Sequence, residues 1–137
     1  MADITLSTAI RTARATAVLT ALDAGAGPAV ALLYTGTPPA TCGPITDQTL
    51  LGTLTCSDPA GTVLDGVLTF AAITPDAAAD TSGTAGFLRL ADSDGAVAVD
   101  LVCGIAGSGK PVILNQLGIV QDGPISVTSA SFVEGGA

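Results

Sequence analysis

From Pro28 to the C-terminus the chain is a series of short apolar runs separated by turn residues, and this pattern restricts the fold more than any other feature. No helical period alternates with these runs, as a parallel α/β fold would require. A chain of 137 residues corresponds to one domain. We therefore predict a mainly β domain, an antiparallel β-sandwich or jelly roll of roughly seven or eight short strands, preceded by one α-helix.

The clearest hairpin of this β region spans residues 84–103. Two apolar runs, 84–91 and 96–103, flank the turn Asp92-Ser-Asp-Gly95, and Asp and Gly are typical of tight turns. Every second residue from Val97 to Leu101 is apolar, so these side chains are expected to face the core. The other strands are predicted at residues 30–35, 50–56, 67–73, 111–114, 117–120 and 125–133.

The helix is predicted from Ser7 to about Leu22, with Ser7 as its N-cap and Gly25, Gly27 and Pro28 as its stop signal. Within the single domain 1–137 we place the helical segment at 7–24 and the β-sandwich at 28–133. Three- and four-residue spacing predicts that one helix face packs on the sheet. That face comprises Ile10, Ala13 or Arg14, Ala17, Val18, Ala21 and Leu22.

The charge balance argues against several classes of partner. Four basic and twelve acidic residues give a net charge of -8, so neither nucleic acid nor an anionic membrane surface is an expected partner. The longest apolar run, 29–34, is too short to cross a bilayer, and the first residues lack the basic start of a signal peptide. We expect a soluble protein, made in the cytoplasm, whose weakly polar surface suits broad contacts.

The sequence offers little for catalysis. It contains no His, so a Ser or Cys nucleophile would lack its usual activating base. Cys42, Cys56 and Cys103 are odd in number and have no CxxC spacing, which predicts reduced, mostly buried thiols rather than disulfides or a zinc site. We predict that the protein is not an enzyme, with no catalytic residues and no cofactor.

Two motifs resemble ligand sites. Residues 104–110 satisfy the phosphate-binding pattern GxxxxGK, but Pro111 stands where that loop needs Ser or Thr and a following helix. We interpret them as a flexible connection. Asp92, Asp94 and Asp100 could offer oxygen ligands to calcium, or could simply form a polar hairpin tip. We favour the tip and predict no metal.

Two roles are possible for each arginine, one within the chain or in water and one in contact with another subunit. Arg89 lies inside a predicted strand, where it either braces the sheet by pairing with a carboxylate such as Asp100 or forms an ion pair with another subunit. Arg11 and Arg14, three residues apart on the helix, either lie in water or meet acidic groups of a neighbouring subunit.

Four segments carry a resemblance to a known class of proteins. They are Leu33-Tyr-Thr-Gly-Thr-Pro38, Gly66-Val-Leu-Thr69, Ser82-Gly-Thr-Ala-Gly-Phe-Leu-Arg-Leu-Ala-Asp-Ser-Asp-Gly95 and Asp122-Gly-Pro-Ile-Ser-Val-Thr128. Together with the preceding helix, their order and Ala/Gly/Thr-rich style resemble small β-rich structural proteins of tailed bacteriophages. Such proteins decorate or cement the capsid, or belong to the collar, tail or fibre attachment.

This resemblance implies a non-enzymatic virion protein, most simply a homo-oligomeric capsid decoration or cement protein. Its expected partners are the major capsid protein or other virion proteins and further copies of itself, in a virion assembled in the host cytoplasm. A tail, collar or fibre-associated binding module is the alternative, and a cryptic hydrolase or nucleotide enzyme is a third. The expected contact residues are Arg11, Arg14, Pro38, Pro39, Arg89, Asp92, Asp94 and Phe132.

Overall fold

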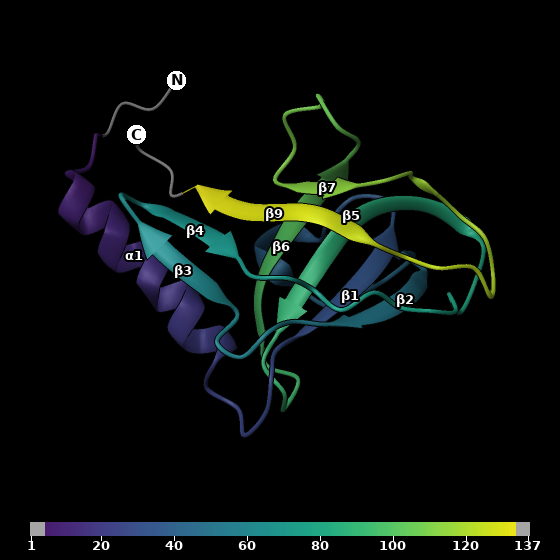
Figure 1. Cartoon of the computed structure of the whole chain (residues 1–137), viewed down its shortest axis with the longest axis horizontal. Helices are drawn as coiled ribbons and strands as arrows, with labels where there is room; N and C mark the ends of the chain where they lie inside the picture. Colours follow the sequence, from purple (N-terminus) through teal and green to yellow (C-terminus); the bar gives the residue numbers. More distant parts are fainter. Residues whose placement is uncertain (1–4, 134–137) are drawn as a thin grey trace.

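The computed structural model describes residues 5–133, and in that range the chain forms one α-helix, nine strands and a short 3-10 turn (Figure 1). The mainly β class with one N-terminal helix is therefore confirmed. The helix is α1 (Thr8–Leu22) and the 3-10 turn is η1 (Ala40–Cys42). The strands are β1 (Val30–Thr35), β2 (Leu50–Thr55), β3 (Gly61–Leu64), β4 (Val67–Phe70), β5 (Gly83–Ala91), β6 (Val97–Gly104), β7 (Val112–Leu114), β8 (Gly118–Ile119) and β9 (Val127–Val133).

The strands belong to a single curled sheet in the order β2-β1-β5-β6-β7-β9-β4-β3, with β8 paired to β5 (Figure 1). Each paired neighbour is antiparallel except β6–β7, which is parallel. The arrangement thus differs in detail from two packed antiparallel sheets. The loop after β6 carries the chain back before β7 begins, so β7 runs in the same direction as β6 rather than folding back as a hairpin.

β2 pairs with β1 on one side, and residues 74–80 cover its other edge. Hydrogen bonds of 2.7 Å from the Thr74 amide to the Thr55 carbonyl and of 2.8 Å from the Asp80 amide to the Leu51 carbonyl hold this segment against β2. On its other side Asp76 exchanges two backbone hydrogen bonds, of 3.1 and 2.8 Å, with Ile125 just before β9. The segment therefore links β2, at one end of the sheet order, to the chain just before β9, and the sheet is partly closed into a barrel.

The Asp76 side chain strengthens this closure. Its Oδ2 accepts a 3.0 Å hydrogen bond from the Thr53 amide of β2, and its Oδ1 accepts one of 3.1 Å from the Ala78 amide. Gly52 leaves the necessary space, since a Cβ there would lie 2.5 Å from Cδ1 of Ile125 and 2.6 Å from Oδ2 of Asp76. A larger residue in β2 at this point would have to displace the ends of these two side chains, so glycine is favoured by close approach rather than by an unusual backbone angle.

Replacing Asp76 by Ala is expected to lower the free energy of unfolding by about 1–3 kcal/mol, because two backbone amides lose their acceptor. Urea unfolding followed by circular dichroism measures the change. Asp80→Ala provides a matched control on the same segment, since Asp80 is exposed, and should change stability by no more than about 0.5 kcal/mol. Equal effects of the two substitutions would contradict the role of the Asp76 carboxylate.

The helix boundaries agree with the sequence, and the predicted buried face is right in part, since Leu22 is buried and Val18 packs against the core. Oγ of Ser7 accepts a 3.2 Å hydrogen bond from the Ile10 amide, which confirms the N-cap. The buried residues are Ala15 and Leu22, whereas Ile10 is 51% exposed. Three alanines of the predicted face, Ala13, Ala17 and Ala21, are also exposed.

Two contacts with the β3–β4 hairpin explain this rotation of α1. Oγ1 of Thr12 accepts a 3.0 Å hydrogen bond from the Gly66 amide, and Oδ1 of Asp23 accepts one of 3.0 Å from the Ala60 amide. The helix is thereby fastened at both ends beside β3 (Figure 1). Because alanines occur all round the helix, the spacing of apolar residues could not distinguish the two faces.

The β3–β4 hairpin itself was not predicted. Asp65 and Gly66 have positive φ angles of 52° and 82°, as both central residues of a type I′ turn require. The pair lies between Val63-Leu64 and Val67-Leu68, so an Asp-Gly signal flanked by apolar residues was present. The strand predicted over 67–73 ends at Phe70, after which the chain leaves the sheet.

The β5–β6 hairpin is confirmed, with Leu88 opposite Leu101 and Arg89 opposite Asp100. Its turn is closed by a 3.0 Å hydrogen bond from the Asp92 amide to the Ala96 carbonyl. The inward position predicted for Val97 is wrong, because this residue is 41% exposed. A register shift between Leu90 and Ala91 breaks the alternation at that end of the hairpin.

Candidate functional site

The most distinctive polar group of the molecule is the ion pair of Arg89 and Asp100. Nε of Arg89 lies 2.8 Å from Oδ1 of Asp100, and Nη2 lies 2.9 Å from Oδ2. The same Nη2 donates a 2.8 Å hydrogen bond to the Gly43 carbonyl. Arg89 is only 4% exposed, and its hydrogen bond to Asp100 raises its pKa. The predicted pairing with Asp100 is confirmed, and the guanidinium is used as a brace within the chain.

The loop between β1 and β2 covers this ion pair and forms a second, small layer on the sheet. Phe87 shares the Arg89 side of β5, is fully buried and stacks on Tyr34 with ring centroids 5.4 Å apart. The segment from Gly36 to Thr49, which contains η1, covers this side of the sheet through the Gly43 contact. Arg89 thus fastens a loop to the sheet face opposite the main core.

Asp92 and Asp94 have different roles in the hairpin tip. Asp92 is 7% exposed, and its Oδ1 accepts 2.9 Å hydrogen bonds from the amides of Asp94 and Ala96. Asp94 is exposed. The Asp92 carboxylate therefore holds the turn, and the Asp100 carboxylate is bound to Arg89. Among residues 5–133, no group of three His, Cys, Asp or Glu side chains is placed to hold a metal ion.

The glycine-rich segment before Lys110 is a loop between two strands. Gly107 and Gly109 have positive φ angles of 85° and 77°, and the Ser108 amide donates a 3.0 Å hydrogen bond to the Ile105 carbonyl. The loop continues through Pro111 into β7. A phosphate-binding loop needs a helix N-terminus at this point, so the surroundings differ from those of a nucleotide site.

The remaining predicted contact residues lie in separate parts of the fold. Arg11 is half-buried and donates hydrogen bonds to the Leu6 carbonyl at 3.4 Å and to Oγ1 of Thr8 at 3.1 Å. Arg14 is exposed on α1, Pro38 and Pro39 are half-buried in the loop above Arg89, and Phe132 is half-buried against the core. The structure does not bring the predicted contact residues together into one site.

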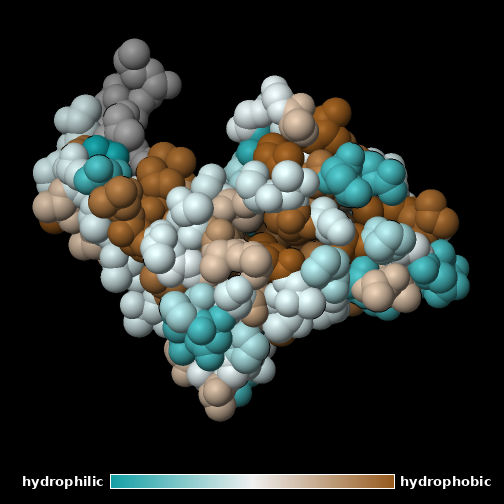
Figure 2. All heavy atoms as spheres, in the orientation of Figure 1, coloured by the Kyte–Doolittle hydropathy of each residue, from teal (hydrophilic) through white to brown (hydrophobic). Residues whose placement is uncertain are grey.

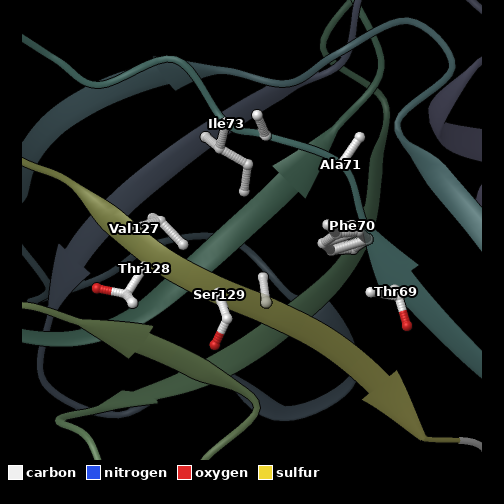
Figure 3. Close-up of a pocket in the computed structure, with 9 residues that line it drawn as sticks. Thr69, Phe70, Ala71, Ile73, Val127, Thr128 and Ser129 are labelled. Carbon is white, nitrogen blue, oxygen red and sulfur yellow. The ribbon is translucent and has the colours of Figure 1, made fainter.

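A slit of about 170 Å³ separates β9 from the segment that follows β4 (Figure 3). The ladder between these strands ends at Thr69 opposite Ser131 and resumes only at Asp76 opposite Ile125. Apolar residues surround the hollow at the centre of the face drawn in Figure 2. The slit is lined by apolar, hydroxyl and main-chain groups, namely residues 69–73 and 127–130, and no ionisable side chain lines it. It can hold water but offers no acid or base.

A larger hollow, of about 410 Å³, lies on the other side of β9. Its walls are mainly apolar and come from Leu101 of β6, Pro111, and Phe132 and Val133 of β9. Lys110 also lines this hollow. Sequence reasoning missed both this hollow and the closure by Asp76, because each is made by residues far apart in the chain.

The three cysteines are unpaired thiols. Burial raises the pKa of Cys56 to about 11, with a smaller contribution from the negative charge of Asp23, and burial raises that of Cys103 to about 12. Both are buried, whereas Cys42 is half-buried. The expectation of reduced, mostly buried thiols therefore agrees with the structure.

Alkylation by iodoacetamide at pH 8 is expected to modify Cys42 first, because Cys56 and Cys103 are inaccessible and protonated at that pH. Mass spectrometry of the folded protein should show one rapid modification, and three in denaturant. Modification of Cys103 in the folded protein as rapidly as Cys42 would contradict the burial described here.

Within residues 5–133, no helix combines the length and the apolar character that crossing a bilayer requires. Comparison of the chain with protein-family models, with curated proteins and with solved structures finds no match.

Proposed function

We propose that the protein is a non-enzymatic structural component of a bacteriophage virion, and that it binds the capsid as a decoration or cement protein. The observation that carries the proposal is an apolar row on the outer strands of the sheet. Leu64, Val67 and Val133 lie opposite one another on β3, β4 and β9. Leu64 is 74% and Val133 59% exposed, and apolar side chains gathered on a surface favour contact with another protein.

The use of the charged groups also supports an adhesive role. The carboxylates of Asp76, Asp92 and Asp100 accept hydrogen bonds that hold the closure, the hairpin turn and the Arg89 brace. These groups therefore act in the architecture of the chain. A protein that works through broad, repeated contacts needs a rigid framework of this kind that presents apolar residues to the centre of the contact.

Co-sedimentation with assembled capsids that lack the protein tests the proposal. The purified chain should bind until a fixed ratio to the capsid protein is reached. Leu64→Asp should weaken binding at least about tenfold, because it places a charge in a desolvated contact. Val120→Asp, which also replaces an exposed apolar residue but lies away from this row, is the matched control and should bind nearly as well.

Circular dichroism must show that both variants remain folded. Binding to isolated tails or collars but not to capsids would overturn the capsid assignment and support the alternative of a tail, collar or fibre-associated module. Binding to neither would overturn the virion proposal.

A further inference from the structure

We infer that the hollow beside Lys110 binds a small amphiphilic anion, a medium-chain fatty acid, whose hydrocarbon chain lies against β9 and whose carboxylate meets the Lys110 ammonium group. The inference goes beyond the proposed virion function and does not depend on it. It rests on the shape of the hollow, the apolar character of its walls and the charge placed there.

The hollow lies where β7 begins, between Leu101 of β6 and residues 131–133 of β9. Residues 109–111, which lead into β7, form one wall. Lys110 is exposed and Val133 is 59% exposed. The hollow is therefore open to solvent on the side of these two residues.

The size of the hollow suits one short hydrocarbon chain. Its volume of about 410 Å³ falls within the range of roughly 300–1,000 Å³ for small-molecule pockets. A methylene group is about the size of a water molecule, which takes roughly 30 Å³ in the liquid, so a chain of eight carbons occupies about 240 Å³ and can be accommodated. A protein–protein contact needs a far broader surface than these few residues offer, so a small molecule fits the hollow better than a partner protein.

The walls favour an apolar ligand. Leu101, Pro111, Phe132 and Val133 supply most of the surface, and none of the described residues that line it is acidic. A hydrocarbon chain that leaves water for these walls gains free energy in proportion to the apolar area buried. Each methylene that enters the hollow should strengthen binding by up to about fourfold.

Lys110 carries the only charge among the described residues of these walls. In the described part of the chain its ammonium group has no ion-pair or hydrogen-bond partner, since its 3.3 Å hydrogen bond to Oγ of Ser108 is made by the main-chain amide. Its stem lies over the end of β6, because a Cβ on Gly104 would be 2.7 Å from Cγ of Lys110. The guanidinium of Arg89, in contrast, is already bound to Asp100. An available cation beside an apolar surface favours a carboxylate at the end of an apolar chain.

The charge of the whole chain opposes this preference. With a net charge of -8, the protein as a whole attracts cations and repels anions. Tighter binding of an anionic amphiphile than of a cationic one of equal length therefore requires a local positive group. Lys110 is the group that the structure places at the hollow.

Titration of the isotope-labelled full chain with sodium octanoate, followed by NMR, tests the inference. We expect saturable shifts confined to the amides of the hollow, at residues 101, 109, 110 and 131–133, with a dissociation constant of about 0.1–10 mM. Hexanoate should bind at least about threefold more weakly, because two methylenes are lost. Octylammonium should bind at least about tenfold more weakly than octanoate, because it brings a like charge to Lys110.

Lys110→Gln tests the role of the charge. It should weaken octanoate binding about threefold, the effect of losing one exposed ion pair, and should narrow the difference between octanoate and octylammonium. Arg14→Gln is the matched control, because it also removes one positive charge at an exposed residue but does not line the hollow. It should bind octanoate like the unchanged chain.

Val133→Asp tests the apolar wall. It removes part of that wall and adds a negative charge, so octanoate should bind at least about tenfold more weakly. Val120→Asp is the matched control, because Val120 is 65% exposed and does not line the hollow. Circular dichroism confirms that each variant folds.

The inference is overturned if octanoate gives no saturable shifts up to about 50 mM, if the shifts spread over the whole surface, or if octylammonium binds as tightly as octanoate. Unchanged binding in Lys110→Gln or Val133→Asp would also overturn it. A chain that binds octanoate but no particle would overturn the proposed function alone. A chain that co-sediments with capsids but does not bind octanoate would overturn this inference alone.

Discussion

Replacement of Arg89 by Met is expected to lower the free energy of unfolding by about 3–5 kcal/mol. The Asp100 side chain, like that of Arg89, is only 5% exposed, so the substitution leaves a carboxylate buried without its counter-charge. The Gly43 carbonyl loses its donor at the same time. Few changes of a single residue in this chain remove so many buried polar contacts at once.

Urea unfolding followed by far-ultraviolet circular dichroism measures this effect, since the chain has no Trp and one Tyr. Lys110→Met is the matched control, because it also removes one positive charge but at an exposed residue, and it should change stability by no more than about 0.5 kcal/mol. The double variant Arg89→Met with Asp100→Leu should recover part of the loss, because neither charge then remains buried. Similar stabilities of Arg89→Met and the control would refute the brace.

Phe87→Ala is expected to cost about 3–5 kcal/mol, the range for removing a buried aromatic ring. Phe87 is fully buried but lies outside the main core, where it stacks on Tyr34. The lost ring leaves a cavity between the sheet and the Gly36–Thr49 segment. We therefore expect limited proteolysis within that segment to become faster than in the unchanged chain.

Phe132→Ala is the control for Phe87, since Phe132 is an aromatic residue that is only half-buried. It should cost roughly half as much or less, because less apolar surface is lost. Equal losses, or unchanged proteolysis of the Gly36–Thr49 segment in Phe87→Ala, would show that Phe87 does not support a separate layer.

The local features of the chain were largely predictable. Ser7 caps α1 through its own side chain, and Asp92 closes the β5–β6 turn through contacts no more than four residues away. The sequence suggested Asp100 as a cross-strand partner for Arg89, and the two residues lie opposite one another. Such features depend on neighbouring residues, so their signals survive in the order of the amino acids.

The candidate contacts were harder to predict. Arg89 and Asp92 were predicted as contacts with other subunits or proteins, but both form hydrogen bonds within the chain, Arg89 with Asp100 and Asp92 with the amide of Asp94. The Asp65-Gly66 turn carried a local signal that the sequence reading overlooked. Asp76 carried none, because its partners Thr53 and Ile125 lie on segments that only the folded chain brings beside it.

The sequence by itself therefore determined most of the strands, the β5–β6 turn and the helix ends, because these depend on backbone preferences and on contacts over a few residues. Tertiary structure decided which face of α1 is buried and how the sheet curls and closes at Asp76. The physical reason is that packing and long-range pairing are chosen by the whole chain, and the small, similar side chains of this protein mark no preferred partner locally.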